Sequence, residues 1–545
     1  MRKLLAVLLL AGAALASYGA DVQEQRRQRA AARQLQQMGI TSDPAKLAES
    51  EGYVVYGAAA GGFVVLNKYG DGTQVLGYSP SAYVPDKMPC GLQWWLRHVD
   101  QALQHGAAAR RARKYSQVDN FLKTRWDQGT PYNDRCPIID KSHAPAGCIA
   151  TALAQVLRYY EWPAQGQGMG GYTVNDNYVE EAVNGVYNWT NMPYVTYGAA
   201  TKQAIKTAVA TLVYDCGKAS RMSYTAEGSG AFTNDQALAL ARNFQYDSLA
   251  LQYCERVFYS SEQWMSMIDA ELQARRPILY AATDAEGQGA HAFVLSGIDK
   301  SGMVYVNWGW GGAGDGFYEV DLLDVPGYKF SQGQEMNIGI QPMPESGPTG
   351  TYHSRWSVYY FAKPAVSSRQ RKLTIPYYFV YNAHFLPFTG QVGLYVESTD
   401  GKGYAQLKLL EQMSPGAIEY GKGYTNLHAD EQDNYDYDPI EVDFDELPAG
   451  AYKLTWVSKD HRESTCQPML CEDTDWLKQS TFYLSKANNG TLTVSNEEIA
   501  SGLRLPSVSE SLPLQYYRLD GTATAAPRRG ITIVRQGSSV RKVIR

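Results

Sequence analysis

The sequence lacks the features that would place a protein in a membrane or on nucleic acid. Beyond the first 16 residues, no stretch approaches the roughly 18 uninterrupted apolar residues of a membrane-spanning helix. The formal net charge is −5 at pH 7, whereas nucleic-acid-binding domains carry a basic surplus. We therefore expect a soluble mature chain without a membrane span and without a nucleic-acid partner.

Cysteine is scarce, and its spacing excludes common metal frameworks. The seven cysteines include no C-x-x-C pair, so a zinc ribbon has no support, and we expect neither a metal nor a cofactor. An odd number leaves at least one thiol free or intermolecular in a secreted protein. Phenylalanine is also rare at 14 residues, against 40 tyrosines and 50 glycines, a mixture typical of exposed β surfaces and long loops.

The first residues have the pattern of a secretory signal peptide. Arg2 and Lys3 precede the apolar run Leu4–Ala16, which ends in small residues of the kind found at cleavage sites. The run is too short to span a bilayer as a mature helix. We therefore expect residues 1–16 to be a signal peptide and the rest of the chain to be secreted.

The N-terminal part of the chain predicts a small α/β unit that ends at a basic linker. Helices are expected at 21–49 and 91–105, and strands at 52–57, 62–67 and 74–79. The run Arg110-Arg111-Ala112-Arg113-Lys114 follows them. Such a run is usually a solvated linker, but in a secreted precursor it is also an accessible cleavage site. We expect residues 21–114 to form one unit.

Two further regions follow the basic run. From Tyr115 to about Pro342 helices come first and strands after, which is typical of an α+β domain. The helices are expected at 148–161, 201–216, 234–244 and 261–275, and the strands at 277–282, 290–298, 303–308 and 316–320. From about Thr351 the pattern is nearly all β and predicts a β-sandwich over 350–487. Its strands are expected at 372–381, 391–397, 406–411, 440–444, 450–459 and 481–484, before a hairpin-like tail at 500–545.

Cys148 lies in the first turn of a predicted helix. Apolar residues recur at spacings of three and four after it, and Pro163 ends the helix near Glu161. The N–H groups of a first helical turn are unpaired and the helix dipole is positive there, and both favour a thiolate. The thiolate is the nucleophilic form of cysteine. The alternative is a small buried cysteine that packs like alanine.

A cysteine nucleophile needs a base, which is usually a histidine. Between residues 115 and 342 the sequence offers His143 and His291. His143 lies in a loop full of alanine and proline and is expected to be a solvated loop residue. His291 enters a strongly apolar strand after two glycines, where a side chain can meet a cleft. Standing alone, His291 would be explained as a satisfied core histidine.

The register of the next predicted strand, at 303–308, determines which side chains lie beside His291. The turn at residues 299–302 predicts a hairpin, and with an even-numbered loop Ile298 pairs with Met303. Continued along the strands, this register places His291 opposite Trp310.

Strand parity then puts Trp308 and Trp310 on the face of His291 and Asn307 on the other face. A one-residue bulge would reverse the assignment, and Asn307 would then orient His291. The register itself favours packing of His291 by Trp308, whose indole would exclude water. Both residues stay candidates for the catalytic site.

Three short stretches resemble the streptopain family of papain-like cysteine peptidases. They are Ala146-Gly147-Cys148-Ile149-Ala150-Thr151-Ala152, Gly289-Ala290-His291-Ala292-Phe293 and Asn307-Trp308-Gly309-Trp310-Gly311-Gly312. In addition, residues 126–133 resemble the start of the mature enzymes, and residues 50–105 resemble their inhibitory propeptide.

The resemblance implies a role for each of the residues in these stretches. Cys148 is the nucleophile and His291 is the general base and acid. The oxyanion is held by the backbone N–H of Cys148 and by a side-chain donor, either Gln128 or a tryptophan indole. Substrate binding is assigned to Trp310, Gly289 and Gln288.

The sequence therefore predicts an α+β chain with a papain-like cysteine peptidase domain at 115–342. A small α/β inhibitory propeptide (21–114) precedes this domain, and an all-β sandwich (350–487) follows it. The tail at 500–545 resembles sorting segments of secreted bacterial proteins.

The expected function is that of a cysteine endopeptidase of a bacterium, secreted or at the cell surface. It would hydrolyse protein or peptide substrates through a Cys148 thioester and be made as a latent precursor whose own propeptide is the inhibitor. Two alternatives remain at this point. One is a non-catalytic binding or adhesion protein on a peptidase-like scaffold. The other is an amidase or transglutaminase of the same fold.

Overall fold

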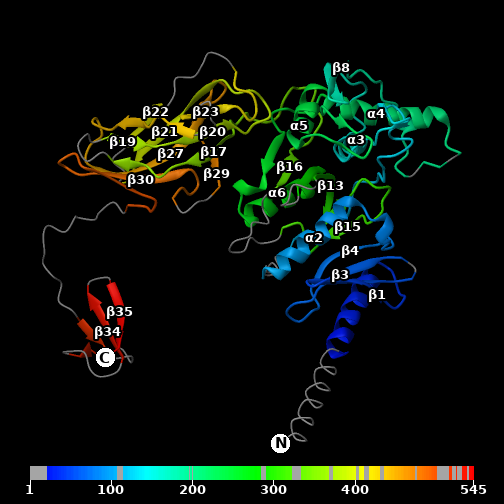
Figure 1. Ribbon diagram of the computed structural model, residues 1–545, viewed down its shortest axis with the longest axis horizontal. Helices are drawn as coiled ribbons and strands as arrows, with labels where there is room; N and C mark the ends of the chain where they lie inside the picture. The colour runs from blue at the N-terminus through cyan, green and yellow to red at the C-terminus, as the bar shows by residue number, and fades with distance from the viewer. Residues whose placement is uncertain are drawn as a thin grey trace, which may run out of the picture.

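The computed structural model describes most of the chain from residue 21 onward (Figure 1). The described residues are 21–59, 61–106, 115–195, 197–198, 200–283, 290–321, 333–366, 372–399, 404–409, 417–429, 435–472 and 476–499, with 515–517, 523–524, 531–536 and 539–544 of the tail. The expected signal peptide, the basic run, Gln288 and Gly289 lie outside the described residues. No helix among the described residues is long and apolar enough to cross a membrane.

The N-terminal unit is an antiparallel sheet with a helix on each face. Its elements are a helix at 21–37, β1 (Ala45–Glu49), β2 (Tyr53–Gly57), β3 (Phe63–Asn67), β4 (Val75–Ser79), the 3-10 turn η1 (Pro85–Lys87) and α2 (Cys90–Gln104). Alternate strand residues face opposite sides. Val55 and Val65 pack with α2, while Val54 and Val64 pack with the first helix. The small α/β unit is thus present.

The first predicted helix is wrong over its last part. The helix ends before Gly39, whose φ of 80° favours glycine, and Ala45–Glu49 is instead strand β1. Ala45 pairs with Gly57 and Glu49 with Val54 at the edge of the sheet. The backbone pairing with β2, which lies further along the chain, therefore outweighs the local helical propensity of Ala45–Glu49.

The sheet of the N-terminal unit continues into the next domain. One ten-stranded sheet has the order β1-β2-β3-β4-β15-β14-β13-β12-β16-β11. The strands not yet given are β11 (Gln252–Glu255), β12 (Ile278–Thr283), β13 (Ala290–Ile298), β14 (Val304–Asn307), β15 (Gly316–Tyr318) and β16 (Gln334–Ile338). At the junction Phe317 pairs with Tyr78. Strands β13 and β14 therefore form the predicted hairpin, and β15 joins the peptidase strands to the N-terminal unit.

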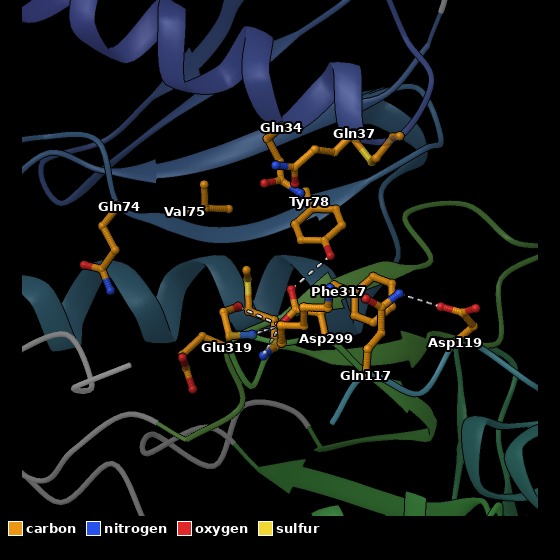
Figure 2. A pocket seen from close by; sticks show the side chains of 14 residues that line it. Gln34, Gln37, Gln74, Val75, Tyr78, Gln117, Asp119, Asp299, Phe317 and Glu319 are labelled. Carbon is orange, nitrogen blue, oxygen red and sulfur yellow. Dashed lines mark hydrogen bonds between the residues drawn. The ribbon is translucent and has the colours of Figure 1, made fainter. Parts of the chain in front are cut away.

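A cavity of about 1010 Å³ lies at this junction (Figure 2). Tyr78 donates its hydroxyl hydrogen to the carboxylate of Asp299 at 3.0 Å, and Gln117 donates to Asp119 at 2.7 Å. Asp299 belongs to the turn between β13 and β14. The N-terminal unit is therefore bound both by backbone pairing and by a side-chain hydrogen bond to the hairpin that carries His291.

The helices of the central region cover both faces of the sheet. They are α3 (Cys148–Tyr160), α4 (Gln203–Ala219), α5 (Thr233–Arg242) and α6 (Ser261–Gln273). Helices α3, α4 and α5 share one core, which includes Ala292 and Val294 of β13. Helix α6 packs with α2 in a second core, which includes Phe293 and Leu295. Strand β13 therefore lies between the two cores, with consecutive side chains facing opposite ways.

The segment at 165–198 contains a hairpin that the sequence analysis missed. Strand β7 (Met169–Val174) pairs with β8 (Asn177–Ala182) through Asn175 and Asp176, whose φ values are 48° and 60°. Two consecutive residues with positive φ make the primed turn that suits a two-residue hairpin. Short elements complete this region: β5 (Ile138–Ile139), β6 (Ser142–His143), η2 (Trp189–Asn191), β9 (Ser223–Tyr224), β10 (Ser229–Gly230) and η3 (Arg256–Phe258).

The C-terminal region is rich in β-sheets, as expected. Its strands are β17 (Trp356–Phe361), β18 (Ala365–Val366), β19 (Lys372–Ile375), β20 (Tyr378–Asn382), β21 (Gly390–Ser398), β22 (Ala405–Leu409), β23 (Gly423–Thr425), β24 (Leu427–Ala429), β25 (Tyr435–Tyr437), β26 (Ile440–Asp443), β27 (Gly450–Asp460), β28 (Gln467–Pro468), β29 (Leu470–Cys471), β30 (Thr481–Lys486) and β31 (Leu492–Ser495). A six-stranded sheet built on β21, β27 and β30 shares one core with the sheet of β17 and β20. The single strand predicted at 372–381 is two strands in different sheets.

Two further features concern the end of the chain. Arg355, just before β17, joins the C-terminal sheets to the central domain, because its guanidinium donates to Gln252 at 2.9 Å and contacts the hydroxyl of Tyr259. The tail contains β32 (Gln515–Tyr517), β33 (Ala523–Thr524), β34 (Ile531–Gln536) and β35 (Ser539–Ile544), and β34 pairs with both β32 and β35.

Candidate active site

The turn before Cys148 requires glycine. Gly147 has φ 86°, and a Cβ atom there would lie 2.8 Å from the backbone oxygen of Ser229. Its own carbonyl accepts hydrogen bonds from the N–H and the hydroxyl of Thr151, at 3.1 and 2.9 Å. These contacts fix the first turn of α3, and Cys148 is its first residue, as predicted.

Cys148 is partly exposed as a residue, but its thiol group is surrounded by protein atoms. Burial raises the pKa of Cys148, while hydrogen bonds from the backbone N–H groups of Ala292, Ile149 and Cys148 itself lower it. The helix N-terminus therefore acts in the predicted direction, but burial outweighs it. The resting thiol is neutral, which is the unreactive form.

His291 is bound by a residue of the N-terminal unit. Its Nδ1 atom lies 3.1 Å from the sulfur of Cys90, the first residue of α2. By strand parity His291 shares the face of Phe293, toward α2, whereas Cys148 packs in the core that contains Ala292. The two predicted catalytic side chains therefore have different core neighbours in this structure, but Cys148 lies close enough to Cys90 to raise the pKa of that thiol.

The Cys90 thiol is also neutral. Burial raises the pKa of Cys90 to about 11, a negative charge on Cys148 raises it further, and a hydrogen bond with Trp310 lowers it. A protonated thiol donates its hydrogen to an unprotonated ring nitrogen. The contact with Cys90 therefore occupies the Nδ1 atom of the His291 ring.

The predicted hairpin register is correct near His291 and wrong near the turn. Val294 pairs with Asn307, which matches the prediction, but Ile298 pairs with Val304 instead of Met303. The register shifts where the incoming chain binds β13, because Val118 forms a bridge with Ile298. The shift in register between Leu295 and Ile298 thus accompanies the long-range pairing with Val118, which the hairpin sequence by itself does not indicate.

Trp308 lies on the same side of the sheet as His291. Its ring centroid is 4.9 Å from that of Phe293. A Cβ atom on Gly91 would lie 2.7 Å from Cε3 of Trp308 and 3.7 Å from Cβ of His291. The first turn of α2 therefore fits against both side chains only because residue 91 is glycine.

Asn307 lies on the opposite face and is 2% exposed. Its side-chain oxygen accepts hydrogen bonds from Gln155 and from the N–H of Gly309, both at 3.0 Å. Its amide nitrogen donates to the backbone oxygen of Thr124 at 2.8 Å. The Asn307 side chain therefore links its strand to helix α3 through Gln155 and to the segment before α3 through Thr124.

Gln128 carries a buried donor with no hydrogen-bond partner, its Nε2 atom. Its backbone oxygen accepts from the N–H of Ala146 at 2.9 Å, two residues before Cys148, and the Asp127 carboxylate accepts from its N–H at 2.6 Å. A buried unsatisfied donor costs about 1–3 kcal/mol. This donor is therefore available to an acceptor that arrives beside Cys148.

The structure adds one residue that the sequence analysis missed. Cys90 stands at a helix N-terminus, as Cys148 does, but its contact with His291 joins residues 201 positions apart. Nothing local in the sequence indicates that contact. Among the described residues, no group of three or more His, Cys, Asp or Glu side chains is arranged to hold a metal ion.

Comparisons with known proteins agree with this geometry. The Peptidase C10 family profile matches residues 126–318. Streptopain from Streptococcus pyogenes is 29% identical over 323 residues, covering 53% of this chain and 80% of streptopain. The thiol protease/hemagglutinin PrtT of Porphyromonas gingivalis is 30% identical over 309 residues, covering 50% of this chain and 35% of that protein.

A solved relative includes a precursor segment. The structure of a prointerpain A fragment from Prevotella intermedia is 34% identical, with a TM-score of 0.50, and covers 55% of this chain and 99% of the fragment. The match extends well beyond the three motifs that carry the resemblance. The chain belongs to the Peptidase C10 family, the streptopain family, and is a cysteine protease.

Proposed function

We propose that the chain is a secreted endopeptidase made as a latent precursor, with Cys148 as nucleophile and His291 as base. One observation carries the proposal: the N-terminal unit binds His291 through Cys90, whose sulfur lies 3.1 Å from Nδ1 of the imidazole. Proton transfer requires hydrogen-bond reach. An imidazole engaged by Cys90 does not serve Cys148 as a base, and loss of α2 frees the imidazole for that role.

The proposed reaction follows from these groups. His291 takes the thiol proton, and the Cys148 sulfur attacks the peptide carbonyl. The backbone N–H of Cys148 and Nε2 of Gln128 hold the resulting oxyanion. His291 then gives its proton to the leaving amine, which leaves a thioester on Cys148. Water, deprotonated by His291, attacks the thioester carbonyl, releases the acid product and restores the thiol.

The domain boundaries belong to the same proposal. Residues 1–16 are a signal peptide, 21–114 the inhibitory propeptide, 115–342 the papain-like peptidase domain and 350–487 a β-sandwich, with a sorting tail at 500–545. The separate hydrophobic core of the C-terminal sheets supports the sandwich. The antiparallel backbone pairing of β4 with β15, a strand of the peptidase domain, supports an inhibitory role for the N-terminal unit.

The substrates proposed are proteins and peptides bound next to β13. Trp310 already contacts Cys90 and so stands beside the space that α2 occupies. A substrate segment would take that space after α2 leaves, and Gln288 and Gly289, which precede His291 in the sequence, are proposed as further substrate-binding residues.

The direct test is hydrolysis of casein by the purified chain. Intact precursor is expected to be inactive, and chain cut within 107–114 is expected to be active and to be blocked by the thiol reagent E-64. Activity insensitive to E-64, or full activity of the uncut precursor, would contradict the proposal.

Gln128→Ala is expected to lower kcat by about 10²–10³ with little change in KM, because an oxyanion donor acts mainly in the transition state. The variant should also be no less stable than the parent, since the donor it loses has no partner at rest. Steady-state kinetics and thermal unfolding of the same samples measure both effects. A raised KM with unchanged kcat would assign Gln128 to substrate binding instead.

Trp308→Ala is expected to lower kcat far more than it weakens substrate binding and to narrow the pH range of activity. The buried indole excludes water beside His291, and charge attraction within the Cys148–His291 pair grows as the local dielectric falls. Asn307→Ala is the matched comparison and should act mainly on stability, because three hydrogen bonds end on its side chain. The reverse order, with Asn307→Ala losing about 10²-fold and Trp308→Ala nearly silent, would make Asn307 the partner of His291.

A further inference from the structure

A buried carboxylate closes the base of the glycine turn, residues 308–315, which connects β14 to β15. The Oδ1 atom of Asp315 accepts a hydrogen bond from the backbone N–H of Trp308 at 2.9 Å. Four glycines between these two residues have positive φ values, namely Gly309, Gly311, Gly312 and Gly314. Because glycine loses more conformational freedom on folding than any other residue, a turn of this composition needs a bond at its base to keep one shape.

Trp308 is held at two points by the end of this turn. Its backbone N–H donates to Asp315, and its indole Nε1–H donates to the backbone oxygen of Gly314 at 3.1 Å. The Tyr318 hydroxyl donates to the same oxygen, and the rings of Tyr318 and Trp308 lie 5.3 Å apart between centroids. The position of the Trp308 indole beside His291 therefore depends on residues 314 and 315.

Asp315 is buried, with 4% of its surface exposed. Burial raises the pKa of Asp315 to about 7, while the N–H of Trp308 and the positive charge of Arg125 lower it. A buried carboxyl group is costly unless it is hydrogen-bonded. The bond to Trp308 and the charge of Arg125 therefore offset the burial of a group that none of the proposed reaction steps uses.

The N-terminal unit adds two further bonds to the glycine turn in the precursor. Ser79 of β4 donates its hydroxyl hydrogen to the backbone oxygen of Asp315 at 2.6 Å, and the N–H of Gly314 donates to the Ser81 hydroxyl at 2.8 Å. Both bonds are lost when the N-terminal unit departs, whereas the bond between Asp315 and Trp308 lies within the peptidase. The turn of the mature enzyme therefore depends on Asp315 more than the turn of the precursor does.

We propose that Asp315 is a positioning residue of the peptidase, whose carboxylate closes the glycine turn and holds Trp308 beside His291 after the N-terminal unit has left. Asp315 acts through Trp308 and is not itself a reacting group. The effect on catalysis rests on the proposed roles of His291 and Trp308, whereas the effect on the shape of the turn does not.

The first test compares two substitutions in enzyme cut within 107–114. Asp315→Ala removes the acceptor, and Asp315→Asn keeps an oxygen in its place. Asp315→Ala is expected to lower kcat for a fluorogenic peptide by about 10- to 100-fold and to change KM by less than about threefold, because a buried N–H loses its partner beside His291. Asp315→Asn should recover most of kcat. Equal losses in the two variants, or a change in KM alone, would overturn the proposal.

The second test asks whether Asp315 acts through Trp308. If it does, the double variant Trp308→Ala/Asp315→Ala should match Trp308→Ala alone in kcat to within about twofold, because the two losses are not additive. Fully additive losses would overturn the proposal. Asp215→Asn is the matched control, since Asp215 is 2% exposed and accepts the N–H of Gly185 at 2.9 Å, but lies in α4. It should leave kcat per folded molecule unchanged.

Amide hydrogen exchange gives a readout that does not depend on catalysis. Peptic peptides that cover 303–315 are followed in the intact precursor and in the linker-cut enzyme. Asp315→Ala should speed their exchange about tenfold or more in the cut enzyme, because an amide loses its partner, and less in the precursor, where Ser79 and Ser81 still bind the turn.

Unchanged exchange in the cut Asp315→Ala enzyme would overturn the proposal. Faster exchange with unchanged kcat would overturn it as well, because Asp315 would then close the turn without positioning Trp308 for catalysis. Neither result bears on whether Cys148 is the nucleophile, which hydrolysis by Cys148→Ala decides.

Discussion

Replacing Cys148 by alanine is expected to lower peptide hydrolysis by about four orders of magnitude or more, as loss of a nucleophile does in other covalent hydrolases. The substitution removes the sulfur that forms the thioester and leaves the glycine turn and helix α3 unchanged. The precursor should therefore fold normally. Hydrolysis of casein and of a fluorogenic peptide by linker-cut enzyme measures the loss.

Cys136→Ala is the control for this experiment. Cys136 is buried, and its thiol makes a long contact of 3.8 Å to the Tyr224 hydroxyl, remote from His291. We expect lower stability by about 1–2 kcal/mol from the small cavity, and unchanged activity per folded molecule. Substantial turnover by Cys148→Ala, or loss of turnover by Cys136→Ala in folded enzyme, would require another nucleophile.

The isolated segment 21–106 is expected to inhibit the mature peptidase at micromolar concentration or below. It brings strand β4 to β15 and the first turn of α2 to His291 and Trp308. Gly91→Val in this segment should weaken inhibition by about 10- to 100-fold, because overpacking of a tight contact typically costs 1–3 kcal/mol. The added Cβ atom would lie 2.7 Å from the Trp308 ring.

Arg97→Val provides the matched control, since it introduces the same side chain on the exposed face of the same helix. It should inhibit as the parent segment does, and circular dichroism should show all three segments equally folded. No inhibition by the parent segment would leave the N-terminal unit as a folding aid or spacer. Equal inhibition by the Gly91→Val segment would mean that α2 does not bind against Trp308 in solution.

The central helices and strands could be predicted because their signals are local. The helix at Cys148 begins after Gly147 and ends before Pro163, so residues next to each end are enough to predict where the helix begins and ends. The faces of β13 and β14 follow from alternation once the turn at 299–302 is recognised. The prediction was exact at Val294, which pairs with Asn307, and failed at Ile298, where Val118 from outside the hairpin changes the pairing.

The state of the site could not be predicted, because it depends on contacts between distant residues. Motif matching identifies Cys148 and His291 as partners, yet the structure places Cys90 against His291 instead. Likewise, the helix N-terminus favours a thiolate at Cys148, but the packing of other elements around it raises its pKa. The burial of a side chain and the partner of a strand depend on the whole folded chain, so a short sequence motif does not predict either of them.

The continuous sheet has a consequence for the mature enzyme. Removing the N-terminal unit strips β4 from β15 and turns an interior strand into an edge, with backbone groups that can pair with another chain. Proteins commonly guard such edges by keeping them short, and β15 has only 3 residues, Gly316–Tyr318. Removal of the N-terminal unit therefore exposes only a short strand edge at β15, which offers few backbone groups for pairing with a second molecule. We expect the mature protease to lose β4 from its sheet without aggregating through this edge.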